Sequence, residues 1–192
     1  TPSPTFPTLL PVAEEIIGPR LVLCRHRVAD ADELLTALTV SRPLLRPWLG
    51  FHEPLTTGEA TRDWLIQREA KWQLREELGF CLRLGATGAY LGSIDLHTIN
   101  WREGFLALGY WLRIGAEGHG YMREAVGLAT DYAFTALGIR QIGIHCDARN
   151  HRSAAVATHC GFTLEAHLRA DHRAYDNVLA DTLQFVKCAP LQ

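Results

Sequence analysis

Residues 115–125, GAEGHGYMREA, place three glycines within six residues directly before a long amphipathic pattern. Glycine costs backbone entropy on folding, so a cluster of it indicates a backbone that closely approaches another group. The N–H groups of such a loop and the dipole of the following helix converge on one point, which suits a phosphate or pyrophosphate. The segment therefore predicts an anion site at a helix N-terminus.

Two common phosphate loops do not fit this segment. The pattern GxxxxGK[ST] is absent because no Lys-Ser or Lys-Thr pair follows the glycines. The pattern GxGxxG is also absent, since Arg123 occupies its last position after Gly118 and Gly120. No parallel strand–helix–strand pattern with a matching acidic residue supports a dinucleotide fold.

Strand and helix patterns surround the glycine cluster. Residues 105–114 are almost continuously apolar and predict a central strand, and residues 121–137 carry an apolar stripe at helical spacing that ends at Gly138. Residues 42–55 are interrupted by proline and predict a loop with a broken helical turn. The other predicted strands are 20–27, 80–84, 90–99, 141–146, 162–167 and 178–186, and the other predicted helices are 30–40, 57–76 and 153–160.

Composition is that of an ordinary globular protein. The chain has 192 residues, 47% of them hydrophobic, and a formal net charge of -2, which argues against broad binding to nucleic acid or anionic membrane. We expect a Pro-rich N-terminal arm, residues 1–19, and one domain, residues 20–192. The chain has no apolar run long enough for a membrane helix and no secretory signal pattern, so we expect a cytoplasmic protein.

Cysteine and histidine patterns do not predict a metal site. The five cysteines are widely spaced without a CxxC pair, and the nine histidines form no HxH or HExxH pattern. Such a set indicates reduced thiols rather than a disulfide framework or a zinc site. The cysteines are Cys24, Cys81, Cys146, Cys160 and Cys188.

The glycine loop and its surroundings resemble motif A of the GNAT superfamily of N-acetyltransferases. That loop reads [QR]-x-x-G-x-[GA]; here Gly118 and Gly120 fill the small positions, and Gly115 stands in place of Gln or Arg. GYWLRI before the loop, YMREA after it and NxxSxxxxxxxGF from Asn150 resemble the branch containing RimJ and RimL. That branch acetylates N-terminal amines of ribosomal proteins. The resemblance covers roughly residues 20–187.

The resemblance implies the fold and the cosubstrate. The expected fold is α/β (α+β), a single GNAT-like domain whose central, mixed and mostly antiparallel sheet of seven predicted strands carries helices on both faces. Acetyl-CoA is the expected cosubstrate, with its pyrophosphate held by backbone N–H groups of the loop, and no metal is expected. The expected cofactor contacts are Leu112, Ile114, Gly115, Gly118, His119, Gly120, Tyr121, Met122, Asn150 and Ser153.

Catalysis requires a base, because an amine attacks a thioester only when it is unprotonated. The family places a carboxylate near the start of the central strand, where Glu103 fits roughly. Asp95 and His97, on the polar face of the preceding strand, are competitors for that role. A solvated turn is the alternative interpretation of Glu103, and an exposed sheet face is the alternative for Asp95 and His97.

Two further site predictions concern the short helix and a Pro-flanked loop. Many family members carry a tyrosine as the acid for the departing thiolate; Ala157 occupies that position here, so Ser153 becomes the candidate acid. Helix capping is the alternative for Asn150 and Ser153. Trp48 and His97 are the candidate substrate-binding residues, with core packing as the alternative for Trp48.

The expected reaction is direct transfer of acetyl from acetyl-CoA to a primary amine, without a covalent enzyme intermediate. A protein N-terminal α-amine is the first expectation for the acceptor. The alternatives are a small-molecule amine, such as an antibiotic, polyamine or toxin, and a non-catalytic acyl-CoA-binding module. The sequence does not identify the acceptor, and a homodimer would fit the family.

Overall fold

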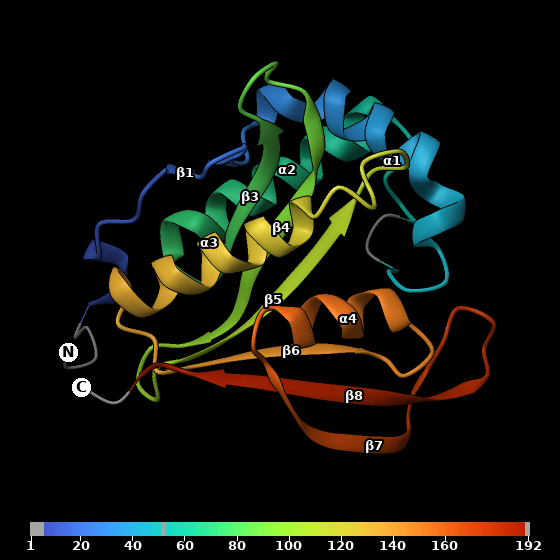
Figure 1. The fold of residues 1–192 in the computed structure, drawn as a ribbon. Helices are drawn as coiled ribbons and strands as arrows, with labels where there is room; N and C mark the ends of the chain where they lie inside the picture. The colour runs from blue at the N-terminus through green and yellow to red at the C-terminus, as the bar shows by residue number, and fades with distance from the viewer. Residues whose placement is uncertain (1–5, 51–52, 191–192) are drawn as a thin grey trace.

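Eight strands form one sheet in the computed structural model, which describes residues 6–50 and 53–190 (Figure 1). The strand order is β1-β2-β3-β4-β5-β6-β8-β7. Only β5 and β6 pair in parallel; every other neighbouring pair is antiparallel. The strands are β1 (Glu15–Ile17), β2 (Leu21–Arg25), β3 (Leu78–Leu84), β4 (Tyr90–Asn100), β5 (Phe105–Leu112), β6 (Gln141–Asp147), β7 (Thr163–Arg173) and β8 (Leu179–Cys188).

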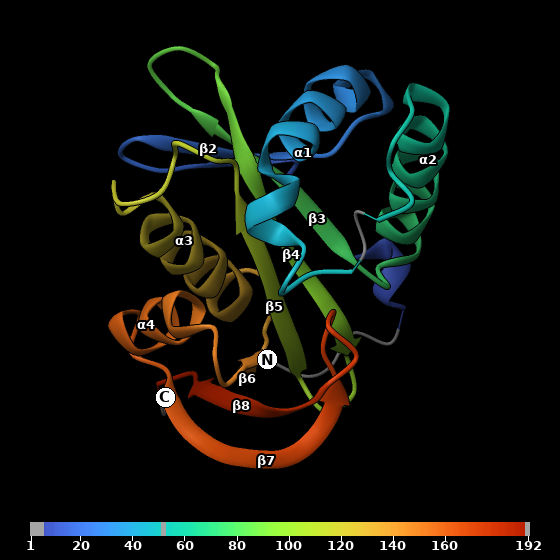
Figure 2. The same ribbon diagram turned by 90° about the vertical axis from the view of Figure 1, so that its right-hand side faces the viewer.

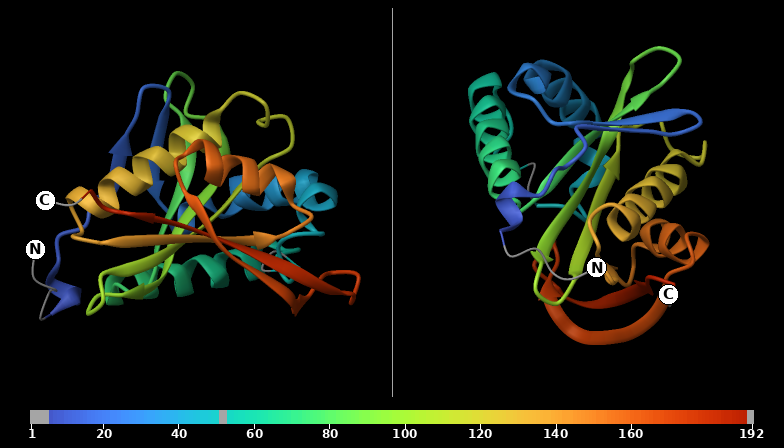
Figure 3. Two further views of the ribbon diagram at one scale, coloured as in Figure 1. Left: turned by 60° about the horizontal axis from the view of Figure 1, so that its bottom comes forward. Right: turned by 90° about the vertical axis from the view of Figure 1, so that its left-hand side faces the viewer.

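Two helices cover each face of this sheet (Figures 2 and 3). The helices α1 (Ala31–Leu45) and α2 (Gly58–Leu74) lie on one face, and α3 (Tyr121–Thr135) and α4 (His151–His159) lie on the other. Two short 3-10 turns, η1 (Pro7–Leu9) and η2 (Val28–Asp30), complete the described elements. The buried apolar faces of all four helices pack against the sheet, which fixes the loops at their ends.

The predicted elements are all present, but α1 ends at Leu45 and β7 at Arg173, well beyond their predicted ends, and one strand was not predicted. Strand β1 pairs with β2, with Glu15 opposite Cys24, although it lies within the predicted Pro-rich arm. The Tyr132 hydroxyl accepts a hydrogen bond from the Ala13 N–H at 2.8 Å and ties this segment to α3. A strand of three residues between prolines shows no readable alternation, so its partner strand and α3 decide its conformation.

The prediction of a loop over residues 42–55 is wrong at its start, because α1 continues through Pro43 to Leu45. Proline removes one helical hydrogen bond, but burial of Ser41 and Leu45 holds the last turn in place. The Ser41 hydroxyl also accepts a hydrogen bond from the Ile114 N–H at 2.9 Å. This contact joins the end of α1 to the loop after β5. Phe51 and His52 lie outside the described residues.

The seam between β5 and β6 is much shorter than the two strands. Their register runs only from Phe105–Gln141 to Ala107–Gly143, although β5 continues to Leu112 and β6 to Asp147. Figure 1 shows the two strands diverging beyond this point. The divergence leaves a gap in the middle of the sheet, flanked by the glycine loop at the end of β5 and the start of α4 after β6.

Candidate functional site

The glycine loop has the backbone shape that the sequence predicted. Gly115, Gly118 and Gly120 have φ angles of 86°, 81° and 76°, a region that residues with a side chain rarely adopt. A Cβ atom built at Gly115 or Gly118 would meet no atom within 4 Å, so open space lies beside the backbone. Gly120 caps α3 without any side-chain hydrogen bond, which leaves the first-turn N–H groups available to an anion.

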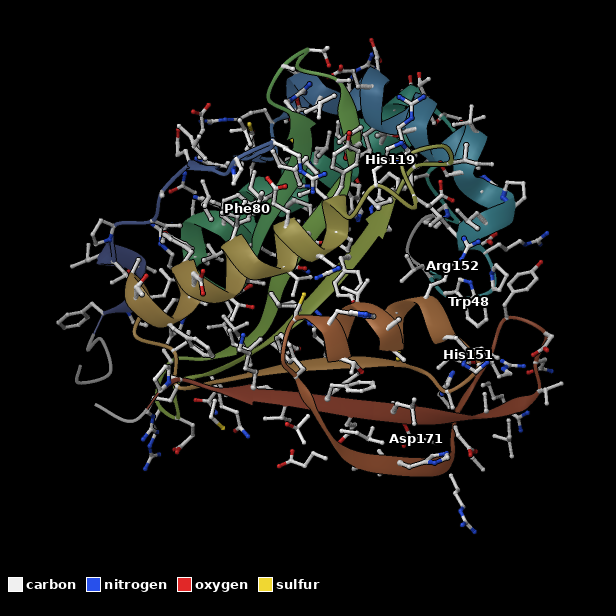
Figure 4. All side chains as sticks on the ribbon, viewed as in Figure 1. Trp48, Phe80, His119, His151, Arg152 and Asp171 are labelled. Carbon is white, nitrogen blue, oxygen red and sulfur yellow. The ribbon has the colours of Figure 1, made fainter. Side chains whose placement is uncertain are left out.

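Charged side chains brace this loop from both sides. Arg20 binds Glu124 in the first turn of α3 at 2.7 Å and donates to the carbonyl oxygen of His119 at 2.9 Å. Glu124 therefore holds the start of β2 and, through Arg20, the glycine loop, in addition to any interaction with the helix dipole. The Glu117 carboxylate accepts a hydrogen bond from the Gly115 N–H at 2.6 Å and lies 3.8 Å from Arg152 of α4. Figure 4 shows His119 at the start of α3 and Arg152 at the start of α4.

The open edge of β5 offers backbone groups to the gap. The Arg113 N–H donates to Leu91 of the β4 side at 2.8 Å. Because alternate residues of a strand direct their N–H groups to opposite sides, Tyr110 and Leu112 direct theirs toward β6. The β5–β6 register ends at Ala107, so within the described residues these groups have no ladder partner on β6. The predicted cofactor contacts Leu112 and Ile114 lie at the end of this edge.

Three polar side chains meet where α4 approaches the gap. The Tyr110 hydroxyl lies 3.1 Å from the Ser153 hydroxyl and 3.2 Å from the Ser153 carbonyl oxygen. Burial raises the pKa of Tyr110, so its phenol keeps its proton at neutral pH. Burial also raises the pKa of Cys146, although a hydrogen bond with Ser153 opposes that shift. Asn150 caps α4 by accepting from the Ser153 N–H at 3.1 Å, so the capping interpretation is confirmed for Asn150.

On the opposite face of the sheet, a cavity of about 360 Å³ opens beside the end of β6. It is lined by the segment after α1, the end of β6, the turn after β7 and one residue of β8. Trp48 lines it and is 38% exposed, so core packing does not account for this residue. We call it the acceptor-side cavity; its lining residues are Arg46, Pro47, Trp48, Leu49, Gly50, His145, Cys146, Asp147, His172, Arg173, Ala174, Tyr175 and Thr182.

The one carboxylate among these lining residues is already engaged. The side chain of Asp147 is only 6% exposed and lies 2.7 Å from Arg149. Hydrogen bonds from Arg149 lower the pKa of Asp147, which keeps it ionised. His172 lies 3.4 Å from the same carboxylate through Nε2 and 3.1 Å from the Thr182 hydroxyl through Nδ1.

Asp95 and His97 lie on the same face of the sheet as this cavity, beneath α2. An exposed sheet face is the wrong interpretation of Asp95, because α2 covers it and Arg68 forms an ion pair with it. Burial raises the pKa of Asp95 to about 6, against the opposing effect of Arg68. His97 is half-buried, and burial lowers its pKa. Its Nε2 would lie 3.2 Å from a Cβ at Gly109, so the ring sits against the central strand near the gap.

Glu103 lies apart from the other predicted catalytic residues. It occupies the exposed turn between β4 and β5, with its side chain 62% exposed and 3.6 Å from Arg102. The glycine loop follows the other end of β5, so the length of that strand separates them. The structure therefore does not bring Glu103 to the gap.

The comparisons with known proteins agree with this geometry. A family model described as the acetyltransferase (GNAT) domain matches residues 20–163. The chain belongs to the GNAT acetyltransferase family. It is similar to YdaF of Bacillus subtilis (strain 168), named as a ribosomal N-acetyltransferase, with 27% identity over 140 residues that cover 73% of this chain and 76% of YdaF.

Solved structures show the same fold. RimL, a ribosomal α-N-protein acetyltransferase in complex with coenzyme A, superposes with a TM-score of 0.86 at 20% identity, over 91% of this chain and 98% of RimL. The microcin self-immunity acetyltransferase MccE, in complex with acetyl-CoA and AMP, superposes with a TM-score of 0.83 at 20% identity, over 90% of this chain and 94% of MccE. The predicted family and fold are thus confirmed for this GNAT acetyltransferase.

Tyr110 is a site residue that sequence reasoning missed. The GNAT resemblance drew attention to the missing tyrosine at Ala157, which is fully buried against the core. Tyr110 supplies a phenol from the opposite wall, on β5 rather than α4. Its place in an unbroken apolar run gave no signal, because the pairing of β5 with α4 depends on the tertiary fold.

One cluster of potential metal ligands occurs among the residues that the structure describes. The donor atoms of His26, Asp30 and Cys81 lie within 4.8 Å of one another. Both Asp30 oxygens already accept hydrogen bonds, one from the Arg27 N–H and one from Arg83. The Arg83 guanidinium thus already supplies a positive charge there, and we assign no metal to the cluster. No helix in the described ranges is both long enough and apolar enough to span a membrane.

Proposed function

We propose that this GNAT acetyltransferase transfers the acetyl group of acetyl-CoA to the N-terminal α-amine of a protein. The observation that carries the proposal is the early end of the β5–β6 seam at Ala107. Beyond that point the unpaired lengths of β5 and β6 lie between the glycine loop and α4 on one face of the sheet and the acceptor-side cavity on the other. Cys146 reaches both sides, since it contacts Ser153 and also lines the cavity.

The residues around the gap fit a thioester of coenzyme A. Backbone N–H groups of the glycine loop and of the uncapped α3 N-terminus hold the pyrophosphate. The unpaired edge of β5 at Tyr110 and Leu112 binds the extended arm as an added strand would be bound. These N–H groups are also donors for the oxyanion that forms when the amine attacks the carbonyl carbon.

Proton transfer is assigned to groups on the two faces of the sheet. His97 accepts the proton of the attacking amine, because its lowered pKa keeps it neutral and its Nδ1 is held by Thr98, which leaves Nε2. Ser153 donates a proton to the departing thiolate and regains one from water, while the Tyr110 phenol keeps its own proton and holds the Ser153 hydroxyl through their 3.1 Å contact.

A protein N-terminus is favoured over a polyamine by the charges of the cavity. A polyamine needs carboxylates to hold its several ammonium groups, whereas Asp147 is already neutralised by Arg149. The names of YdaF and RimL support the same acceptor class. A small-molecule amine is the second candidate, supported by the aromatic lining from Trp48 and Tyr175 and by the similarity to MccE.

Acetyl-CoA binding and acceptor use are tested together. Calorimetry should show binding by the wild type and severe loss in Gly120→Trp, because the large side chain enters the loop at a position with φ of 76°. Circular dichroism checks that the variant remains folded. Thiol release with peptides bearing free N-terminal amines is then compared with release by spermidine and free amino acids. Thiol release with small amines alone would favour the second candidate, and binding without any acceptor-stimulated release would indicate a non-catalytic module.

A further inference from the structure

Of the two arginines that line the acceptor-side cavity, one has no carboxylate partner among the described residues and the other has only a solvent-exposed one. Arg46 and Arg173 both line it, and Asp147 is the carboxylate among the described lining residues. Because Asp147 is buried and held by Arg149, it neutralises neither cation. Arg173 donates to the carbonyl oxygen of Asn177, and no carboxylate partner for it occurs among the described residues.

The other carboxylates near the cavity, Glu53 and Asp176, have arginine partners, and neither forms an ion pair with Arg173 among the described residues. Arg46 is 3.4 Å from Glu53 through Nε, and both side chains are largely exposed, so this pair is screened by water. Asp176 lies 3.4 Å from Arg149, the same arginine that forms the ion pair with Asp147. His145 and His172 add further N–H donors and no negative charge.

An aromatic ring places the Arg46 guanidinium on a defined surface of the cavity. The Arg46 guanidinium lies 4.1 Å from the centre of the Tyr175 ring, which holds it against the turn after β7. Trp48 is the second aromatic residue in the lining. A guanidinium fixed in this way presents its remaining N–H donors to a carboxylate in a planar array. Arg173 is held instead by its hydrogen bond to the carbonyl oxygen of Asn177.

We propose that the preferred acceptor is an acidic peptide N-terminus, with Asp or Glu within the first few residues after the reacting amine. The acidic side chain binds Arg173 and Arg46 while the α-amine enters the gap. This inference rests on the proposed function, since it names the class of N-terminus that the same site takes. It also gives a reason for the engaged state of Asp147, because a free carboxylate there would repel such a peptide.

Matched peptides test the proposal. Each peptide begins with a free serine, and the peptides differ only at the third and fourth positions, which are Asp-Glu, Asn-Gln or Lys-Lys. We expect kcat/KM for the Asp-Glu peptide to exceed that for Asn-Gln at least about 5-fold, and Lys-Lys to be poorest. The preference should shrink in 0.5 M NaCl, because partly exposed charge pairs are screened by salt.

Variants assign the preference to this cavity. Arg173→Gln and Arg46→Gln should each reduce the ratio of Asp-Glu to Asn-Gln, Arg173→Lys should retain most of it, and Arg173→Glu should favour Lys-Lys. Arg102→Gln is the matched control, because Arg102 lies on the remote β4–β5 turn and is 92% exposed. Equal kcat/KM for the Asp-Glu and Asn-Gln peptides, or an unchanged ratio in both Arg→Gln variants, would overturn the proposal.

A second acceptor pair separates this inference from the proposed function. Glutamic acid α-amide and glutamine α-amide carry the same reacting amine with and without a nearby carboxylate. If no peptide is acetylated while the glutamic acid amide is preferred, the peptide acceptor fails and anion recognition survives. If neither pair shows a preference for the acidic member while peptides are acetylated, the proposed function stands and the anion inference is wrong.

Discussion

Ser153 shows how one side chain is placed by contacts from separate elements. Its N–H is capped by Asn150 within α4, and its hydroxyl reaches Tyr110 on β5 across the gap. Neither neighbour alone would fix the hydroxyl at the point where we propose that the thiolate departs. The pair therefore acts as a unit, and single substitutions should have overlapping effects.

Removing either hydroxyl of this pair should slow the chemical step. We expect Ser153→Ala to lower kcat about 10- to 100-fold with little change in KM, because the proton donor acts in the transition state. Tyr110→Phe should lower kcat less, since Ser153 can still exchange protons with water. Steady-state kinetics of the two single variants and the double variant provide the test. Additive losses in the double variant would show that the two hydroxyls act independently.

His97 should control the acid side of the pH profile. Burial lowers the pKa of His97, so its neutral form persists below the ordinary histidine pKa of 6.5. Activity should therefore rise with pH below that value and reach a plateau as His97 loses its proton. In His97→Asn we expect kcat/KM to fall about 10-fold or more and the acid limb to be lost. An unchanged acid limb in His97→Asn would assign the base elsewhere, with Asp95 as the next candidate because its pKa is about 6.

At the scale of elements, the sequence patterns located each long strand and helix but not their contacts across the chain. The glycine loop was predictable because three glycines directly before an amphipathic helix indicate backbone conformations that other residues rarely adopt. The extension of α1 through Pro43 was not, since burial of Leu45 outweighs the local cost of proline. The acceptor-side cavity was also hidden, apart from Trp48, because its walls come from segments more than 100 residues apart.

The glycine loop already holds an internal carboxylate. Glu117 accepts from the Gly115 N–H, so it competes with a phosphate for the loop donors. We expect Glu117→Gln to tighten acetyl-CoA binding about 3-fold, because the substitution removes a like charge from the anion site. Calorimetry measures the change, and Glu103→Gln on the remote turn is the control. Weaker binding in Glu117→Gln would mean that the carboxylate orders the loop instead.

At the scale of the whole molecule, the buried side chains of His26 and Asp95 change the free energy of unfolding in opposite directions as the pH falls. Burial, with Arg68 and Arg83, lowers the pKa of His26 to about 3, so the stability it contributes is complete above pH 6.5 and declines as pH falls below that value. Asp95 has a folded pKa of about 6, above its ordinary value of 3.8, so the protein gains stability as pH falls through 6.

These opposing effects should nearly cancel in the wild type between pH 6 and 4. We expect His26→Asn to gain stability relative to the wild type as pH falls through this range, and Asp95→Asn to lose it, each by about 1 kcal/mol per pH unit. Urea unfolding of the three proteins at pH 6, 5 and 4 measures the free energies. Parallel pH dependences for all three would show that neither group titrates as its burial implies.

The seam between β5 and β6 consists of three residue pairs, yet it is the junction between five strands and the remaining three. A ligand that binds along the open edge of β5 beyond Ala107 would take the place of the missing strand pairing. It would thereby stabilise the contact between the five strands on one side and the three on the other. The folded fraction of the protein would then rise with the concentration of that ligand, by mass action. A cell short of that ligand would hold less of the folded protein, because unliganded molecules open more often and are degraded first.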